Sequence, residues 1–288
     1  MAGTITEVVI PAAGLGTRMA AITGGSPKEL LLIAGKPAIQ YAIEEAYLGG
    51  IRDFYIVINR EKEEIRRYIM YGEEIPGVSR NALSSLNKIK ESTRFHFLYQ
   101  ERPTGEAEAI LIGGRKTRGN AFGVIYPDNI AVPPGRMMRG LIRNFSTIGE
   151  EIIGLIEVRA ETAPLMGDSG HLDTEPLEDD LYRVIRFLPK TKGKFKLRFP
   201  GELRSTGFSI TKQESLPLIE KQLKKTSTGE VIDLHFREET LKLRPIYAWK
   251  MNGEVFDIGN PDGYQACKMY VEDNWMYIKG NQEASESL

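Results

Sequence analysis

Cysteine and histidine are scarce in this sequence, with one cysteine and three histidines among 288 residues. The lone Cys267 cannot form a disulfide within the chain, which is typical of proteins from a reducing compartment. His96, His171 and His235 are scattered and show none of the paired spacings of zinc ligands. The sequence therefore excludes an internal disulfide framework and gives no sign of a zinc site.

The sequence also lacks a large net charge and long apolar runs. The 38 basic residues nearly balance the 39 acidic ones, and the net charge of −1 gives no support for a nucleic-acid or membrane surface. No apolar run approaches the roughly 20 residues of a membrane span, and the N-terminus lacks the basic and apolar regions of a signal peptide. We therefore expect a cytoplasmic protein without nucleic-acid or membrane partners.

Strands and helices alternate over the first half of the sequence. Short apolar runs predict strands at 8–10, 54–58, 95–100 and 122–126, and amphipathic spacing predicts helices at 37–48, 61–71 and 105–113. The weak pattern over 72–91 predicts a loop with a short helix. Because such alternation implies right-handed βαβ crossovers, we predict an α/β fold with a doubly wound, mainly parallel, Rossmann-like sheet.

The second half contains more strands and longer loops. We predict strands at 152–158, 181–187, 195–199, 207–210, 244–250 and 255–257, helices at 215–225 and 261–275, and a turn-rich stretch at 162–180. The run 190–199 alternates cations with apolar residues, which favours a strand with a solvated face over a nucleic-acid site. A soft boundary near Glu150 would divide one continuous sheet, and 279–288 would form a disordered tail.

A glycine-containing bend follows the first predicted strand. It consists of Ala12, Ala13, Gly14, Leu15, Gly16 and Thr17, four of which are alanine or glycine. Small residues let main-chain N–H groups approach a ligand closely, and a helix beginning near Thr17 would favour an anion at its N-terminus. Arg18 adds a guanidinium fork and Lys28 a point charge. These features together predict a site for a polyphosphate.

Other interpretations of the bend are weaker. No lysine follows a glycine at the spacing of a phosphate-binding loop, and Met19 stands where the dinucleotide fingerprint has its third glycine, which disfavours an NAD enzyme. On the two glycines alone, a plain tight turn explains the bend equally well. The decisive pattern is Gly14-x-Gly16-Thr17-Arg18 with Pro27-Lys28-Glu29 downstream.

That pattern resembles the sugar-1-phosphate nucleotidyltransferase family, and most closely the bacterial UTP–glucose-1-phosphate uridylyltransferases. The resemblance is carried by residues 10–19, 26–30, 35–41, Asp128 and 257–260. It implies that residues 1–150 form a nucleotide-binding half and 151–278 a sugar-phosphate half of one domain. It also implies transfer from an NTP to a sugar 1-phosphate, which releases pyrophosphate and a nucleotide-sugar, by a homodimer or homotetramer. UTP and glucose 1-phosphate are the first choice; dTTP or CTP with another sugar or cyclitol phosphate is the alternative.

Two aspartates are candidate ligands of Mg²⁺. Asp128 follows a predicted buried strand, where a carboxylate in a parallel sheet faces the ligand cleft, although it could instead cap the next turn. Asp257 precedes the last predicted helix and could simply support that turn. The resemblance implies that both hold Mg²⁺, that Arg18 stabilises the leaving pyrophosphate, and that Lys28 stabilises the α-phosphate.

The resemblance also implies that Gln100 and Gly105 contact the base. A side-chain amide both donates and accepts hydrogen bonds, as the edge of a pyrimidine requires. Glu108 departs from the family pattern, because uridylyltransferases often carry a histidine or a small polar residue there. The base preference therefore stays open between uracil, thymine and cytosine.

The acceptor half departs most from the family. Relatives carry a Glu-Lys-Pro tripeptide that binds the sugar and its phosphate, whereas this chain has Phe187, Leu188 and Pro189. We expect Arg186 or Lys190 to supply the missing cation, and the resemblance implies that Gly167 and Glu230 contact the acceptor. Leu188 alone favours a rival interpretation, a nucleotide-binding regulatory homologue without turnover. The retained Arg18, Lys28, Asp128 and Asp257 favour the enzyme.

Overall fold

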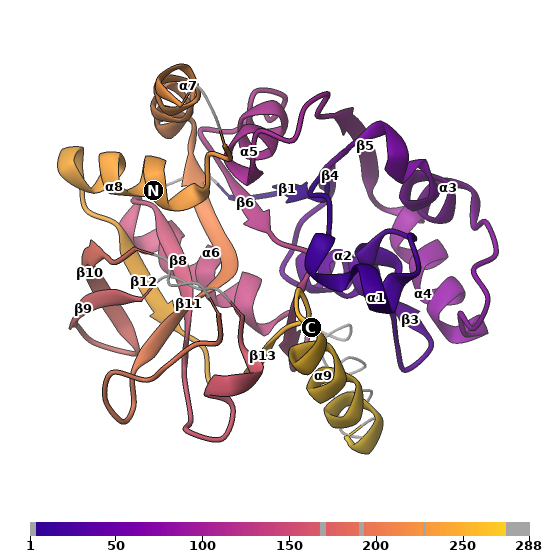
Figure 1. The fold of residues 1–288 in the computed structure, drawn as a ribbon. Helices are drawn as coiled ribbons and strands as arrows, with labels where there is room; N and C mark the ends of the chain where they lie inside the picture. The colour runs from indigo at the N-terminus through magenta and orange to yellow at the C-terminus, as the bar shows by residue number, and fades with distance from the viewer. Residues whose placement is uncertain (1–3, 168–170, 190–192, 227–228, 275–288) are drawn as a thin grey trace.

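A nine-stranded sheet runs through the molecule (Figure 1), in the order β5-β4-β1-β6-β11-β8-β12-β10-β9. The computed structural model describes residues 4–167, 171–189, 193–226 and 229–274. The strands span Glu7–Pro11 (β1), Asp53–Ile58 (β4), Arg94–Tyr99 (β5), Ala121–Ile125 (β6), Ile152–Glu157 (β8), Leu172–Pro176 (β9), Leu181–Phe187 (β10), Leu203–Lys212 (β11) and Tyr247–Lys250 (β12). The α/β, Rossmann-like class predicted from the sequence is confirmed.

Strands β5, β4, β1 and β6 are parallel and form the first half of the sheet. Their side chains alternate between two cores, because successive residues of a strand point to opposite faces. Val8 and Ile10 pack against α2 (Ala38–Leu48) and α6 (Arg136–Ile148), whereas Val9 packs against α5 (Glu106–Gly114) and α7 (Leu216–Lys225). Burial on both faces explains the unbroken β-branched run that predicts β1.

The long strand β11 joins the two halves of the sheet. It pairs antiparallel with β6 on one side and with β8 on the other. Beyond β8 the sheet continues through the parallel β12 and ends in the antiparallel β10 and β9. Strands from both sides of residue 150 therefore interleave in one sheet, and the tail predicted for 279–288 lies outside the described residues.

Two expectations about local structure were wrong, and a third, a loop with a short helix over 72–91, was right except for the length of the helix. Residues 195–199 form no strand, and Phe195 instead buries its ring against His171, 4.4 Å away between centroids. The turn-rich stretch 162–180 contains β9 and the short helix η4 (Ala163–Leu165). The region 72–91 contains the twelve-residue α4 (Arg80–Glu91), which begins at a capping Ser79.

Several further elements had no sequence prediction, among them α6, α8 (Asp233–Leu243) and β7 (Asn129–Val132). In α8 the charged Arg237 is buried among apolar residues, which weakens the helical periodicity. In α6 the apolar face is regular, with Met137, Met138, Leu141 and Phe145 buried, and the prediction overlooked it. The remaining helices are α1 (Ala20–Thr23), α3 (Glu63–Tyr71) and α9 (Pro261–Asp273), and a two-stranded ribbon joins β2 (Leu32–Ile33) to β3 (Lys36–Pro37). Among the described residues, no helix is long and apolar enough to cross a membrane.

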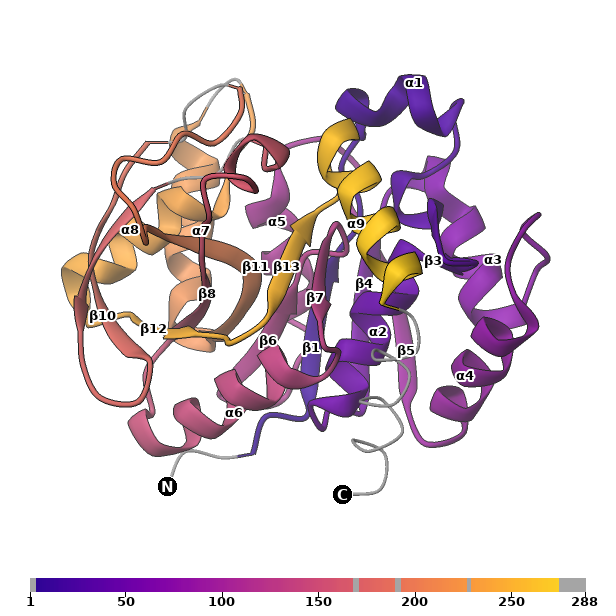
Figure 2. The same ribbon diagram turned by 90° about the horizontal axis from the view of Figure 1, so that it is seen from below.

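The C-terminal elements return to the first half of the chain. Strand β13 (Glu254–Asp257) pairs antiparallel with β7, and α9 follows it, as Figure 2 shows. Asn260 caps α9 by accepting a hydrogen bond from the Gly263 amide at 2.9 Å. The helix then packs near Ile33 and Tyr41. This return brings β13 to the end of β6.

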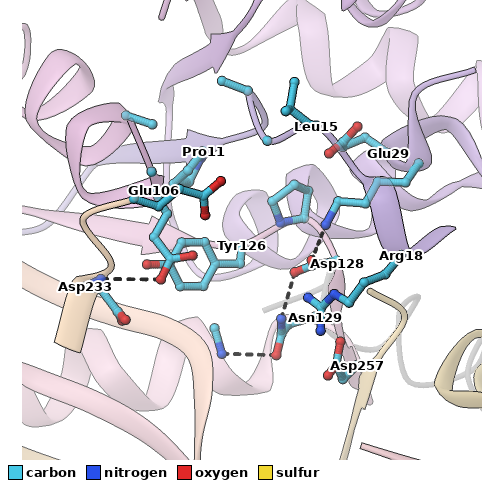
Figure 3. A pocket seen from close by; sticks show the side chains of 18 of the residues that line it. Pro11, Leu15, Arg18, Glu29, Glu106, Tyr126, Asp128, Asn129, Asp233 and Asp257 are labelled. Atoms are coloured by element: carbon cyan, nitrogen blue, oxygen red, sulfur yellow. Dashed lines mark hydrogen bonds and ion pairs between the residues drawn. The ribbon is translucent and has the colours of Figure 1, made fainter. Parts of the chain in front are cut away.

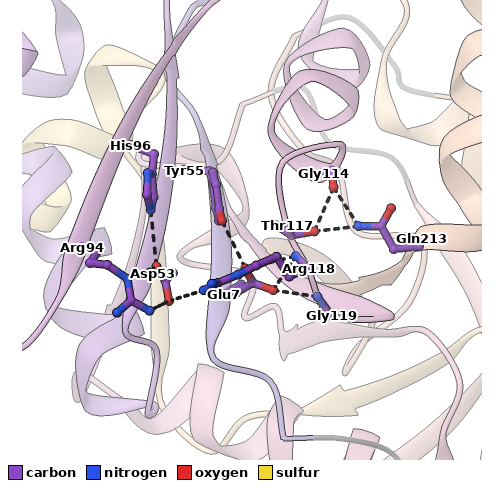
Figure 4. A network of polar contacts seen from close by, with 10 residues as sticks. All are labelled: Glu7, Asp53, Tyr55, Arg94, His96, Gly114, Thr117, Arg118, Gly119 and Gln213. Carbon is purple, nitrogen blue, oxygen red and sulfur yellow. Dashed lines mark hydrogen bonds and ion pairs between the residues drawn. The ribbon is translucent and has the colours of Figure 1, made fainter.

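A polar network ties together the first residues of β1, β4 and β5 (Figure 4). Asp53 accepts from the Arg94 Nε at 2.7 Å, and Glu7 accepts from the Arg118 amide at 2.9 Å and from the Tyr55 hydroxyl at 3.1 Å. Both carboxylates are nearly buried, and their cationic partners are exposed. The network pairs the polar side chains at the amino ends of the parallel strands. A ligand would bind at the opposite, carboxyl ends.

Candidate active site

A cavity opens at the carboxyl ends of β1 and β6 (Figure 3). Its walls come from the bend after β1, the start of α5, the β6–β7 turn, the middle of β11 and the end of β13. The charged and polar residues that line it are Arg18, Lys28, Glu29, Gln100, Glu106, Tyr126, Asp128, Asn129, Arg204, Ser205, Thr206, Glu230, Asp233 and Asp257. The cavity therefore lies where an open parallel sheet binds its ligands.

The bend contributes Pro11, Ala13, Gly14, Leu15 and Arg18 to the wall. Gly16 has φ +67°, a left-handed conformation that an L side chain rarely adopts. A 3₁₀ turn follows at Thr17–Met19, and α1 then adds one helical turn. A helical segment does begin at Thr17, although it is too short to carry a large macrodipole.

The buried Lys62 stabilises the bend through two hydrogen bonds. Its Nζ donates to the Ala12 carbonyl at 3.0 Å and to Glu29 Oε2 at 2.8 Å. The Asn59 amide donates to the Ala13 carbonyl at 2.8 Å. Lys62 was missed from the sequence, because one lysine in the charged segment 60–67 is indistinguishable from a surface cation.

Asp128 and Asp257 meet at the β7–β13 ribbon, although they are far apart in the chain. The register pairs Asp257 with Asn129, and the Ile258 amide donates to the Asp128 carbonyl at 2.8 Å. A Cβ on Gly259 would lie 2.9 Å from Asp128 Oδ2 and 3.0 Å from Asp257 Oδ1. The two carboxylates therefore face one small space, which spacing in the sequence does not show.

Charge pairing keeps Asp128 ionised. Lys28 Nζ lies 2.5 Å from Asp128 Oδ2, and the Asn129 amide donates to Oδ1 at 2.9 Å. Burial raises the pKa of Asp128, but the nearby Lys28 charge and these hydrogen bonds outweigh it and lower the pKa to about 2. Burial lowers the pKa of Lys28, and the charges of Asp128 and Glu29 outweigh it to raise that pKa. Both groups are charged at neutral pH.

Asp257 is fixed by main-chain donors. The amides of Gly167 and Gly259 each donate to its carboxylate at 3.0 Å. A Cβ on Gly167 would lie 3.1 Å from both Arg18 Nη1 and Asp257 Oδ2, so the Arg18 guanidinium reaches this carboxylate region. Arg18, Lys28, Asp128 and Asp257 are thus brought together, and Gly167 supports Asp257 without lining the cavity.

Gln100 and Gly105 line the other end of the cavity. The Gln100 amide nitrogen donates to the Gly105 carbonyl at 3.0 Å and to Glu108 Oε2 at 2.9 Å. Gly105 has φ +107°, and a Cβ there would lie 2.4 Å from the Val231 carbonyl oxygen. The glycine is therefore required for docking the chain around Val231, in addition to any contact with a base.

The same docking brings acidic residues to this end. Glu230 and Asp233 flank the docked segment and line the cavity with Glu106. Figure 3 shows the Tyr126 ring between these carboxylates and Asp128. The Tyr126 hydroxyl is buried and has no hydrogen-bond partner within the described residues, and burial raises its pKa well above its ordinary value. Glu106, Tyr126 and Asp233 were missed, because nothing in their spacing marks them.

Of the two cations predicted for the acceptor, Arg186 lies away from the cavity. Arg186 Nε donates to Asp173 Oδ2 at 2.6 Å on an outer strand, and its side chain is 66% exposed and does not line the cavity. Lys190 lies outside the described residues. Arg204 on β11 was missed, yet it is 4% exposed, lines the cavity, and places Nη2 3.5 Å from Asp257 Oδ2.

Comparison of the sequence with models of known protein families identifies the family to which this chain belongs. The family described as Nucleotidyl transferase matches residues 7–274. This chain belongs to the nucleotidyl transferase family.

Several relatives of this nucleotidyl transferase are similar along almost their whole length. It is 28% identical over 264 residues to UTP–glucose-1-phosphate uridylyltransferase YngB of Bacillus subtilis (strain 168), covering 90% of this chain and 86% of that protein. It is 26% identical to UTP–glucose-1-phosphate uridylyltransferase of Pseudomonas aeruginosa PAO1, covering 94% and 97%. A solved UDP-glucose pyrophosphorylase complexed with UDP-glucose superposes with a TM-score of 0.78 at 27% identity, covering 94% and 99%. The family predicted from the bend is confirmed.

Proposed function

We propose that this nucleotidyl transferase joins UTP to glucose 1-phosphate and releases pyrophosphate. The names of its relatives support this choice of substrates. The observation that carries the proposal is the convergence of Asp128, Asp257 and Arg18 around Gly259, at the edge of the glycine-containing bend. A regulatory homologue that only bound a nucleotide would not need all of these groups in one place.

In the proposed reaction, an oxygen of the acceptor phosphate attacks the α-phosphorus of UTP. A new P–O bond forms as the bond between the α-phosphorus and the bridging oxygen breaks, and that oxygen leaves on pyrophosphate. This chain provides positioning and charge neutralisation, without a covalent nucleophile. Arg18 stabilises charge on the leaving pyrophosphate, and Lys28 stabilises charge at the α-phosphate.

Asp128 and Asp257 fit a divalent cation, for which Mg²⁺ is the proposed choice. Mg²⁺ takes one or two carboxylates and fills its remaining positions with water and phosphate oxygens. Across the part of the chain that the structure describes, no cluster of three or more histidine, cysteine or acidic residues is placed to hold a metal ion by itself. The cation would therefore need water and phosphate oxygens as further ligands. When bound, the cation would neutralise charge on the phosphate oxygens.

The charge of the cavity also favours a cation-dependent reaction. Six carboxylates and three cationic side chains line it among the described residues. A polyanionic substrate would therefore be repelled without added positive charge. The proposal predicts that chelation of divalent ions stops turnover.

The test is pyrophosphate release measured with each NTP, Mg²⁺ and a panel of sugar and cyclitol phosphates. UTP with glucose 1-phosphate should give the highest kcat/KM, and EDTA should abolish the signal. Faster turnover with dTTP, CTP or another phosphate would reassign the substrates. Absence of turnover with every pair would support the regulatory homologue instead.

A further inference from the structure

The two sides of the cavity differ in where their cations come from. Arg18 and Lys28 lie on the bend, beside the proposed polyphosphate. On the opposite wall, Arg204 is the one cation that the described residues after 150 contribute to the lining. Among the residues that the structure describes, Arg204 is therefore the cation available to an acceptor phosphate that approaches from that wall.

Arg204 is held firmly by its place in the sheet. It lies near the start of β11, where it pairs with Ile156 of β8 on one side and with His171 on the other, and only 4% of the residue is exposed. Its Nη2 lies 3.5 Å from Asp257 Oδ2, which places the guanidinium next to the two aspartates. A buried guanidinium is costly without anionic partners; Asp257 is one such partner, and a phosphate bound in the cavity that Arg204 lines would be another.

The strand register relates Arg204 to Leu188. Arg204 pairs with His171, and the register of β9 and β10 continues to pair His171 with Leu188, whose amide donates to the His171 carbonyl at 2.8 Å. Residues paired in this way project from the same face of a sheet. Leu188 and Arg204 thus share one row, about 10 Å apart across two strand spacings.

We propose that Arg204 binds the phosphate group of the acceptor, in place of the lysine that family resemblance implies at the position of Leu188. The inference rests on the proposed function, and it names the acceptor class as a phosphate monoester. The guanidinium offers two parallel N–H donors to phosphate oxygens, whereas a lysine offers a point charge. From its position beside Asp257, Arg204 directs the attacking oxygen toward the α-phosphorus.

The rival explanation is that Arg204 only holds Asp257 in place. In that case the loss of Arg204 would change the KM for UTP and the dependence of the rate on divalent ions as much as it changes the KM for the acceptor. Contact with the acceptor phosphate predicts a different pattern, because only the KM of the acceptor should change strongly.

The first experiment is steady-state kinetics of Arg204→Gln and Arg204→Lys. We expect Arg204→Gln to raise the KM for glucose 1-phosphate about ten- to a hundredfold, since a charge-assisted hydrogen bond is lost, and to leave the KM for UTP and the Mg²⁺ dependence within about twofold. Arg204→Lys should fall between, and it keeps the test valid if the glutamine variant fails to fold. Arg183→Gln, at an exposed arginine on β10, is the matched control.

Three results would overturn the proposal. The first two are an unchanged KM for glucose 1-phosphate in Arg204→Gln, and a rise in its KM for UTP equal to the rise for glucose 1-phosphate. The third is a raised KM for glucose 1-phosphate in Arg186→Gln but not in Arg204→Gln. The double variant Leu188→Lys, Arg204→Gln should recover acceptor affinity. A lack of recovery would contradict the placement of the phosphate over this row of side chains.

Equilibrium binding separates this inference from the proposed function. Isothermal titration calorimetry with glucose 1-phosphate, inorganic phosphate and glucose requires no turnover. We expect Arg204→Gln to weaken binding of both phosphates at least tenfold, whereas glucose binds weakly to both forms. If the unaltered protein releases no pyrophosphate but shows this loss, the proposed reaction fails and the phosphate site stands. Equal binding by both forms would overturn the site.

Discussion

At the residue scale, the proposed reactive centre depends on two carboxylates that a two-stranded ribbon holds together. Neither aspartate is reactive by itself, and each is already surrounded by donors. Asp128 is paired with Lys28, and Asp257 accepts from two main-chain amides. The arrangement orients both side chains before any ligand arrives.

Removal of either carboxylate charge should therefore abolish most turnover. We expect Asp128→Asn and Asp257→Asn each to lower kcat about a hundred- to a thousandfold, as is typical when one preorganised electrostatic group is lost. The assay is pyrophosphate release at saturating UTP and glucose 1-phosphate, with thermal unfolding to confirm folding. Near-normal kcat in either variant would rule out a joint role for the two aspartates.

A substitution at Gly259 should lower activity without a large loss of stability. An alanine Cβ there would lie 2.9 Å from Asp128 Oδ2 and 3.0 Å from Asp257 Oδ1, so both carboxylates must move while the backbone need not. We expect Gly259→Ala to lower kcat about a hundredfold, because small displacements are costly in a positioned site. The free energy of unfolding should change by less than about 1 kcal/mol. A large loss of stability with normal kcat would reverse this interpretation.

The sequence predicts individual site residues where a local pattern marks them. The bend, Arg18 and Lys28 stand in a recognisable order, and Asp128 follows a buried strand. Arg204 and Tyr126 carry no such mark, because their importance arises from the register of β11 and from the docking of the chain around Val231. Such residues become visible only after the strands are paired.

At the element scale, α3 supports the bend through Lys62, which ends the 3₁₀ turn η3 (Arg60–Lys62). The ion pair with Glu29 and the hydrogen bond to the Ala12 carbonyl link this turn to the wall of the cavity. The length of α4 was underestimated from the sequence. Its buried residues Ala82, Leu86 and Ile89 follow the helical spacing i, i+4 and i+7, but three apolar positions in twelve residues make a narrow stripe.

Loss of Lys62 should weaken both the fold and nucleotide binding. Lys62→Met leaves the buried Glu29 carboxylate without its partner, so we expect the free energy of unfolding to fall by about 3–5 kcal/mol. The KM for UTP should rise because the Ala12 carbonyl loses its donor. Urea unfolding and initial rates measure the two effects. Lys88→Met, at an exposed lysine of α4, is the control, and equal behaviour of the two variants would contradict the account.

At the scale of the whole molecule, one sheet separates a structural end from a reactive end. The network around Asp53 closes the amino ends of β1, β4 and β5, and the cavity lies at their carboxyl ends. The alternation of strands and helices predicts this architecture. It does not predict that β11 inserts between β6 and β8, because antiparallel insertion leaves no local signal. The oligomeric state and the cytoplasmic location stay predictions.

Acid should loosen the structural end. The hydrogen bond from Arg94 and the nearby charges outweigh burial and lower the pKa of Asp53 below its ordinary value. A lowered folded-state pKa stabilises the protein above the unfolded pKa, and this contribution disappears as the pH falls below about 4. We expect Asp53→Asn to be less stable at pH 7 and to lose less stability between pH 5 and pH 2. Urea unfolding across this range measures both effects.

The control for that experiment is Asp179→Asn at an exposed turn. It should keep the stability and the acid response of the unaltered protein. An Asp53→Asn variant with the same acid response as this control would show that the network contributes nothing.

The central claim is that Asp128 and Asp257 share a divalent cation during nucleotide transfer. Crystals grown with Mn²⁺ and UTP allow the metal to be located by its anomalous scattering. The account predicts a strong peak in contact with both carboxylates and with a phosphate oxygen of UTP. A peak that touches neither aspartate, or UTP bound in the cavity with no metal at this pair, would contradict it.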